Sequence, residues 1–215
     1  MLGEAELRRA IATVLLRSAG LPTLEDAVEK LRGVRERVDV VLAYRDPEWG
    51  RAARSLLEPA VEAGAARLRE AKAGDWARNR PQPLITVGGR LGHRFMFYGL
   101  PGDILQPVFL LAVAAAGDAW RARGCGGLEG AGGRLVLYVV PGLPCVRALY
   151  NALQVLLCSG EAVLEAVNVE TMVLQGMRPP VDRVPAFATP RGGLVKVVPR
   201  SPGEAARLWG RAGGG

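Results

Sequence analysis

The sequence predicts an α/β protein made of two consecutive units, each a mixed sheet of about four strands flanked by helices. One observation is the stretch 135–159, where a buried strand, a Pro/Gly turn and an apolar helix follow one another directly. A second is that residues 38–116 and 135–211 repeat one order of elements: strand, helix, strand, hairpin, helix. A glycine-rich connector separates them, so we divide the chain into units 1–118 and 119–215.

The first unit begins with two helices. The first, at 4–18, carries an apolar face made of Leu7, Ile11, Val14 and Leu15. Thr23 and Asp26 have capping-box spacing and open the second helix. The other expected elements are a strand at 38–44, a helix at 47–63, a weak strand at 66–72, a hairpin at 83–87 and 93–98, and an apolar helix at 101–116.

The second unit opens with the organising stretch. Residues 135–140 are apolar and rich in β-branched side chains, which suits a strand covered on both faces. Pro141 and Gly142 end this strand, and Pro144 fits the first turn of a helix that runs to residue 158. The other expected elements are strands at 162–169, 186–189 and 194–198, a helical segment at 171–177 and a helix at 201–211.

Composition restricts the function. The 215 residues are 49% hydrophobic with a net charge of +7, and all but three of the 28 basic residues are arginine, a usage found in thermophiles and in GC-rich genomes alike. Because 21 acidic residues are interleaved with them and no aromatic-laced basic stretch occurs, we expect an ion-paired surface rather than a nucleic-acid interface. The longest apolar run is too short for a membrane span, so we expect a soluble, cytoplasmic protein.

The three cysteines do not form a disulfide framework in this interpretation. Cys145 stands at a helix start, where the helix dipole lowers a thiol pKa. Cys158 lies about 20 Å further along the same helix, so it cannot pair with Cys145, and we expect it to be buried and inert. Cys125 lies in the flexible connector, and its pairing with Cys145 stays open.

Other chemistries lack the residues they need. The chain has a single histidine, His93, and no cluster of metal ligands, so we expect no metal and no cofactor. No G-x-S-x-G motif is present for a serine hydrolase. The glycines of the connector precede a strand, whereas a dinucleotide-binding loop follows one.

Three passages resemble a known family. They are 97–102, which ends the first unit, 141–146 at the strand-to-helix turn, and 183–187. In these passages the chain resembles the archaeal protein disulfide oxidoreductases, glutaredoxin-like proteins of two tandem thioredoxin-fold units. These proteins are related to the N-terminal region of alkyl hydroperoxide reductase flavoproteins. The resemblance implies redox turns near 45–51 and 141–146 and a cis-proline loop facing each turn.

The chain departs from this family at both redox turns. The family has proline, any residue, then Cys-x-x-Cys in the second unit, and an ungapped match replaces both cysteines with Leu143 and Val146. A one-residue deletion would instead make Cys145 the resolving cysteine, and the attacking cysteine is missing either way. The turn at 45–51 has no cysteine. The degenerate turn positions are Leu143, Pro144, Val146, Glu48, Trp49, Gly50 and Arg51.

The resemblance also implies where a peptide would bind. In thioredoxin folds the residue before the cis-proline offers its main chain to an extended substrate as an added strand. The corresponding pairs here are Val184-Pro185 and Gln82-Pro83, which we expect to be cis.

Two functions follow from these expectations. The first is a peptide- or protein-binding module that has lost dithiol exchange. The alternative is a glutaredoxin-like thiol–disulfide oxidoreductase that acts through Cys145 alone with an external thiol as resolver. The sequence indicates neither the partner nor the oligomeric state.

Overall fold

The computed structural model describes residues 3–122, 124–190 and 193–209. The helices are α1 (Glu4–Ser18), α2 (Leu24–Arg32), α3 (Pro47–Glu62), α4 (Gln106–Ala116), α5 (Leu143–Cys158), α6 (Val169–Leu174) and α7 (Pro202–Trp209). The strands are β1 (Val38–Tyr44), β2 (Ala66–Lys72), β3 (Leu84–Val87), β4 (Phe95–Tyr98), β5 (Gly132–Val139), β6 (Glu161–Asn168), β7 (Ala186–Ala188) and β8 (Leu194–Val195). Three short 3-10 helices are η1 (Asp75–Arg78), η2 (Gly89–Leu91) and η3 (Asp103–Leu105).

All eight strands form one mixed sheet in the order β2-β1-β3-β4-β6-β5-β7-β8. In the first half β1 pairs parallel with β2 and antiparallel with β3, and in the second half β5 pairs in the same ways with β6 and β7. The two halves join through a parallel pairing of β4 with β6. The predicted α/β fold with a mixed sheet flanked by helices is therefore confirmed.

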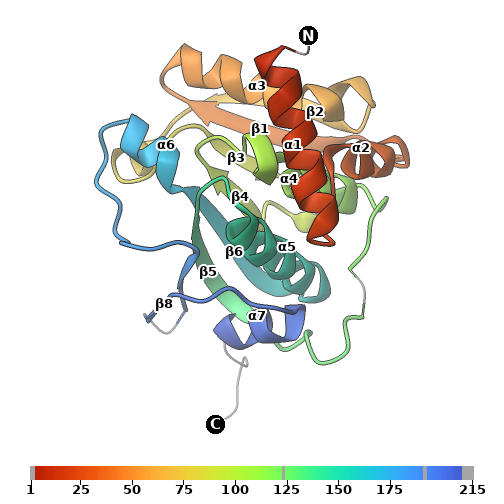
Figure 1. The fold of residues 1–215 in the computed structure, drawn as a ribbon, viewed down its shortest axis with the longest axis vertical. Helices are drawn as coiled ribbons and strands as arrows, with labels where there is room; N and C mark the ends of the chain where they lie inside the picture. The colour runs from red at the N-terminus through yellow and green to blue at the C-terminus, as the bar shows by residue number, and fades with distance from the viewer. Residues whose placement is uncertain (1–2, 123, 191–192, 210–215) are drawn as a thin grey trace.

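One face of the sheet, here called the first face, lies under the helices. Alternate residues of β1 are fully buried there, as are Phe95 and Phe97 of β4, whose rings pack against Phe109 of α4. In Figure 1 α5 lies in front of β5 and β6 and covers the second half in the same way. Because α4 is apolar on all sides, it is buried between the sheet and α2, α3 and α5. No helix among the described residues is long and apolar enough to span a membrane.

The opposite face, here called the second face, has a smaller core of its own. Tyr98, Val136, Tyr138 and Val167 are buried there together with Met172 of α6. Two irregular segments lie against this core: Arg80, which follows η1, stacks over Tyr98, and Met177 and Val181, which follow α6, pack on the cluster. The second face is therefore only partly covered.

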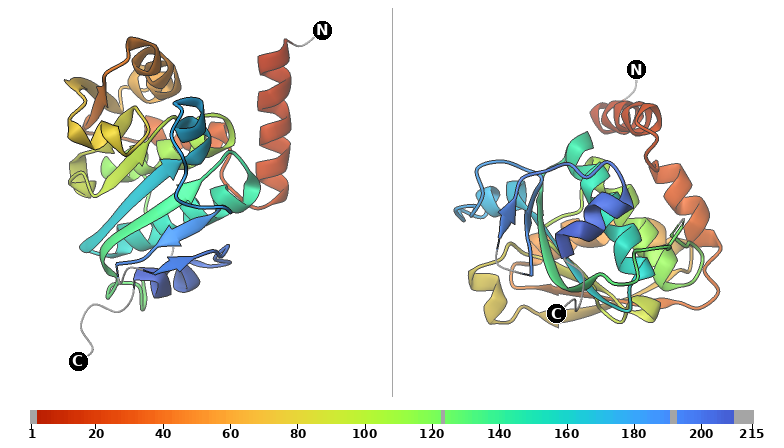
Figure 2. Two further views of the ribbon diagram at one scale, coloured as in Figure 1. Left: turned by 90° about the vertical axis from the view of Figure 1, so that its left-hand side faces the viewer. Right: turned by 90° about the horizontal axis from the view of Figure 1, so that it is seen from below.

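Helix α1 forms as expected, but its apolar face does not pack on the body. Leu7, Ile11 and Val14 are 50%, 51% and 67% exposed, and among the side chains of α1 that the structure describes only Leu16 is buried. Figure 2 shows α1 standing away from the sheet, which it approaches at its C-terminal end. Helical periodicity indicates that a helix has an apolar side, and here the body does not cover that side.

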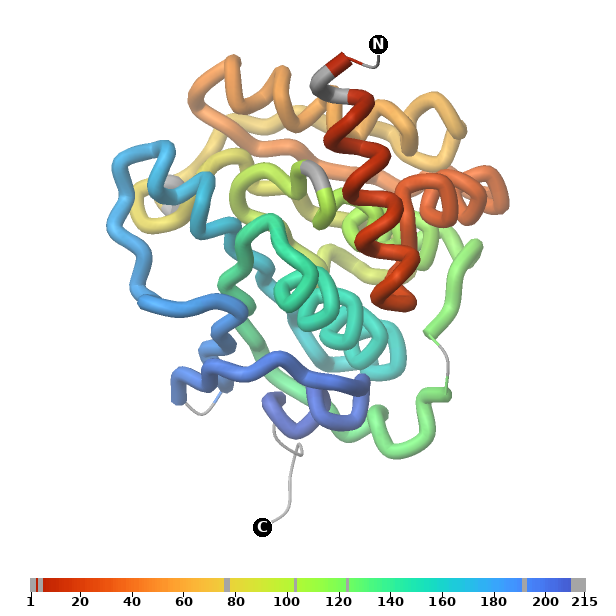
Figure 3. Tube along the Cα trace, in the orientation of Figure 1, coloured from red at the N-terminus to blue at the C-terminus, as the bar shows by residue number. Residues whose placement is uncertain are grey.

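The connector between the halves is held by a disulfide between Cys125 and Cys158. This corrects two expectations: Cys158 is not an inert free thiol, and the connector is not an untethered linker. Leu128 is buried as well, so the connector, whose path can be followed in Figure 3, packs beside the C-terminal end of α5. Spacing along the chain could not indicate this pairing, because the fold of the connector decides it.

The two halves are also tied together beside the β4–β6 pairing. The Asn168 side chain caps α6 and donates to the Leu100 carbonyl oxygen at 2.8 Å, while the Leu100 N–H donates to the Thr171 hydroxyl at 3.2 Å. Gly99 has a φ of 90°, and a Cβ there would lie 2.8 Å from the Cβ of Thr171. Only glycine fits this close approach.

Candidate functional site at the carboxyl edge of the sheet

The topology brings every predicted site position to the carboxyl ends of the parallel strands, here called the carboxyl edge of the sheet. Strands β1, β4, β5 and β6 run parallel, so the turns that follow them lie together. Strands β3 and β7 run the other way and begin at this edge, which places the proline loops 82–83 and 184–185 beside those turns. Ligand sites of open α/β sheets lie at such carboxyl ends.

The turn that opens α3 is closed by the side chains of Asp46 and of Gln82 from the first proline loop. Asp46 caps the helix by accepting the N–H of Glu48 at 2.8 Å. The side-chain oxygen of Gln82 accepts the N–H of Arg45 at 2.6 Å and that of Asp46 at 3.4 Å. Of the predicted positions of this turn, Trp49 is half-buried and Gly50 is buried, while Glu48 and Arg51 are exposed; none of them is a thiol.

Cys145, the only predicted catalytic residue, is buried. It is the third residue of α5, its side chain is in the main core, and it is 2% exposed. Its Sγ accepts the N–H of Val140 at 3.5 Å. Burial raises the pKa of the Cys145 thiol, and the hydrogen bond from Val140 only partly opposes this. The expectation of a lowered pKa at the helix start is therefore wrong, because the side chain points into the core and not toward solvent.

The start of α5 differs from that of α3 in lacking a cap. No side chain caps it, and its N-cap residue is Gly142. Leu143 is half-buried and Pro144 is exposed, while Val146 is buried in the core. The N–H groups of Leu143 and Cys145 in the first turn therefore have no side-chain acceptor among the described residues.

Both proline loops have the predicted cis geometry, at Gln82-Pro83 and Val184-Pro185. The pairing of β7 with β5, extended by two residues, places Val184 beside Val140 at the start of the α5 turn. Contact of Gln82 with Arg45 likewise places the first loop beside the α3 turn. The cis geometry of both loops is therefore confirmed. The hydrogen bond of Gln82 shows that the first loop faces its turn, and the strand register indicates the same for the second.

The two loops differ in what their main chains contact. The Gln175 side chain donates to the Gln82 carbonyl oxygen at 2.7 Å and accepts the Gln82 N–H at 2.9 Å. The polar groups that a peptide would use at Gln82 are thus already paired. At Val184, neither the main-chain N–H nor the C=O forms a hydrogen bond with any described residue.

A shallow cavity of about 430 Å³ lies between the two turns. Trp49 of α3, Pro141 before α5, and Glu170 and Leu174 of α6 are among the residues that line it. Leu174 is 70% exposed, so the rim carries an apolar side chain in water. Sequence reasoning missed Glu170, Leu174 and Gln175, because the short α6 shows no motif and its position depends on the β4–β6 pairing.

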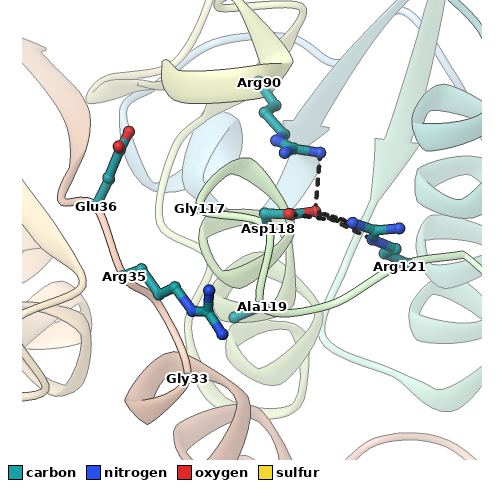
Figure 4. Close-up of a pocket in the computed structure, with 8 residues that line it drawn as sticks. All are labelled: Gly33, Arg35, Glu36, Arg90, Gly117, Asp118, Ala119 and Arg121. Carbon is teal, nitrogen blue, oxygen red and sulfur yellow. Dashed lines mark hydrogen bonds and ion pairs between the residues drawn. The ribbon is translucent and has the colours of Figure 1, made fainter.

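Another cavity, of about 610 Å³, lies at the opposite end of the strands, and charged side chains of both signs line it. Arg90 and Arg121 both point at the Asp118 carboxylate, at 2.9 and 3.0 Å, as Figure 4 shows. The hydrogen bond from Arg121 lowers the pKa of Asp118. The ends of α2 and α4 also line this cavity, and helix C-termini favour cations. These arginines therefore have a structural reason to be there.

The described residues contain no group of three or more His, Cys, Asp or Glu side chains placed to hold a metal ion. No family model matches the sequence, and the comparison with curated proteins found no match.

The fold, however, is shared with solved structures of thioredoxin-like proteins. One is the alkylhydroperoxide reductase AhpF from Enterococcus faecalis, with a TM-score of 0.67 and 13% identity over 86% of this chain and 96% of that chain. A protein disulfide oxidoreductase from Aeropyrum pernix has a TM-score of 0.62 and 16% identity over 86% of this chain and 90% of that chain. A Sulfolobus solfataricus protein has a TM-score of 0.56 and 14% identity over 76% and 91% of the two chains. At these identities the likeness is one of fold.

Proposed function

We propose that this protein is a thioredoxin-fold peptide-binding module that has lost dithiol exchange, and that a peptide pairs with the main chain of Val184. The observation that carries this proposal is the unpaired N–H and C=O of Val184 beside the uncapped start of α5. An extended peptide supplies a donor and an acceptor at that spacing, as an added strand does. Gln82 takes no part, because Gln175 occupies its main chain.

The absence of a reactive thiol at the edge supports the loss of exchange. Attack on a disulfide requires an accessible thiolate. Cys145 is buried with a raised pKa, and Cys125 and Cys158 are bonded to each other near the far end of α5. An oxidoreductase acting through Cys145 alone would need that side chain to leave the core.

The bound peptide would be extended, with apolar side chains beside Trp49 and Leu174. The division of the chain into units 1–118 and 119–215 is part of this proposal. The second unit binds the peptide, and α3 of the first unit forms one wall of the cavity beside it. No cofactor is needed for this function.

The test uses a peptide without disulfides, the S-carboxymethylated insulin B chain, titrated into ¹⁵N-labelled protein. The amide signals of Val184 and Leu143 are expected to shift on binding, and that of Gln82 is expected to stay. Val184→Pro removes the N–H donor and should weaken binding about three- to tenfold, the worth of one hydrogen bond. Val197→Pro makes the same change at an exposed valine away from the α5 turn and should bind as the wild type does.

Two results would contradict the proposal. One is binding that shifts signals elsewhere and leaves Val184 and Leu143 unmoved. The other is equal affinity for Val184→Pro and Val197→Pro, with both variants folded by their amide spectra. Saturable binding with the expected shifts supports it.

A further inference from the structure

A cavity of about 520 Å³ on the second face of the sheet is separate from the peptide edge just described. The segments 78–80 and 176–180 form its walls, and Tyr138 of β5 lines it from the sheet. Met172 and Met177 contribute apolar surface, and Arg78, Arg80 and Arg178 contribute positive charge. This volume is in the range of small-molecule sites.

Arg80 is held in a fixed position in this cavity. Its guanidinium lies over the ring of Tyr98, 5.6 Å from the centroid, and donates to the Tyr138 hydroxyl at 3.2 Å. A third contact is the ion pair with Glu165, at 3.6 Å. The side chain is only 21% exposed, so these contacts act in a partly dry site where they are strong.

Glu165 explains how the arginines come to lie on an apolar sheet face. Its side chain is 2% exposed and pairs with Arg134 at 2.6 Å as well as with Arg80. One Glu165 oxygen, Oε2, is buried without a hydrogen bond. One carboxylate thus faces two guanidinium groups, and the local balance is one positive charge in excess even before Arg178 is counted. A buried charge is costly unless paired, so Glu165 holds Arg80 where it is.

Donors are left over in the cavity. Arg178 forms no hydrogen bond or ion pair with any described residue. The Tyr138 hydroxyl accepts from Arg80 and has its own proton left to donate, because its only described hydrogen bond is that one. Arg78 contacts Asp75 at 3.6 Å, where both side chains are more than 70% exposed, so this pair is weak.

We propose that this cavity binds the carboxylate or phosphate group of a small ligand whose apolar part contacts Met172 and Met177. Arg80 and Arg178 supply charge-assisted hydrogen bonds to the anionic group, and the Tyr138 hydroxyl supplies a third donor. Arginine suits both anions, because its planar fork matches their oxygen atoms. This cavity shares no residue with the proposed peptide site at Val184. The proposal of anion binding is therefore independent of the proposal of peptide binding.

The test is calorimetric titration at low ionic strength with three probes that share a phenyl ring. Phenyl phosphate and phenylacetate carry the two candidate anions, and phenylacetamide is the neutral match of phenylacetate. At least one anion is expected to bind, and the tighter of the two identifies the group that the site prefers. Phenylacetamide should bind at least about tenfold more weakly than phenylacetate if the carboxylate is recognised.

Three variants locate the binding. Arg178→Gln and Tyr138→Phe should each weaken the preferred anion, by about tenfold and about threefold respectively. Arg207→Gln makes the same charge change at an exposed position of α7 and should leave affinity unchanged. Because Arg80→Gln alone would leave Glu165 short of a partner, the double variant Arg80→Gln with Glu165→Gln is used, and it should abolish binding.

Several outcomes would overturn the proposal. They are no binding of either anion up to about 10 mM, equal binding of phenylacetamide and both anions, or equal effects of Arg178→Gln and Arg207→Gln. Each would show that the Glu165 cluster serves the packing of the second face alone.

Discussion

At the scale of single residues, the direction of one side chain decides the chemistry of Cys145. Its place at the start of α5 favours a thiolate, since helix N-termini stabilise negative charge. Its side chain nevertheless lies in the main core. There the desolvation of the thiolate is larger than its stabilisation by the helix N-terminus, so the pKa of the thiol is raised. The same residue on the solvent side of the helix would be reactive.

We predict that native Cys145 resists alkylation. Without reductant, so that Cys125 and Cys158 stay paired, iodoacetamide at pH 8 should modify it at least about tenfold more slowly than in urea-unfolded protein. Because its pKa is raised on folding, its contribution to stability is present below the ordinary thiol range and is lost as pH rises toward the folded pKa. The loss of free thiol, followed by mass spectrometry, gives both rates.

The same burial predicts no insulin reductase activity above background in the wild type or in Cys145→Ser, with a dithiol reductant supplied. Robust turnover that Cys145→Ser abolishes would instead establish the single-cysteine enzyme. Rapid native alkylation would show that the side chain reaches solvent.

At the scale of elements, the two turns share a backbone plan and differ in closure. At the α3 turn Asp46 and Gln82 satisfy the free N–H groups, and Gln175 then pairs with the Gln82 main chain. At the α5 turn no described side chain accepts the free N–H groups, and none pairs with the main chain of Val184. The α3 turn is therefore a closed version of this site and the α5 turn an open one. Gln175, the residue that follows α6, completes the closure at the α3 turn.

We predict that Gln175→Ala opens the loop at Gln82. Its main-chain N–H and C=O lose their partners, so a peptide can pair there as it does at Val184. In the titration with carboxymethylated insulin B chain, the Gln82 amide should begin to shift, and the stoichiometry should rise from one peptide to two. Val173→Ala, an exposed change on α6, should keep the wild-type response. Loss of all binding in Gln175→Ala would assign Gln175 to the binding surface itself.

At the scale of the whole molecule, the halves share a sheet and a core. The β4–β6 pairing makes the sheet continuous, and the main core contains residues of α2 and α4 together with residues of α5 and α7. Neither half can unfold without exposing apolar surface of the other. Such shared burial favours one cooperative transition.

We therefore predict a single unfolding transition in urea, coincident for amide signals of β1 and of β5. Phe97→Ala, which removes a fully buried ring beside the β4–β6 pairing and against Phe109, should cost about 3–5 kcal/mol. It should shift both sets of signals together. Two separated transitions, or a shift confined to the first half, would show that the halves unfold independently.

Local patterns could predict much of this molecule. A continuous apolar run predicts α4, and apolar periodicity predicts α5. The capping box of Thr23 and Asp26 forms as predicted, and both proline loops lie where the resemblance puts them. These features depend on residues close together in the chain. The pattern also predicts α1 and its apolar face, but an apolar stripe does not say what covers it, and these side chains are exposed.

The sequence by itself determined the order of elements, the mixed sheet, and the absence of an attacking cysteine at either turn, because these follow from local residue types. Only the tertiary structure decided the Cys125–Cys158 disulfide, the inward direction of Cys145, and the pairing of Gln82 with Gln175. The two pairings join residues that are 33 and 93 positions apart in the chain, and the direction of Cys145 depends on how α5 is rotated on its sheet. Rotation and pairing are set by the packing of the whole core, which no short stretch of sequence specifies.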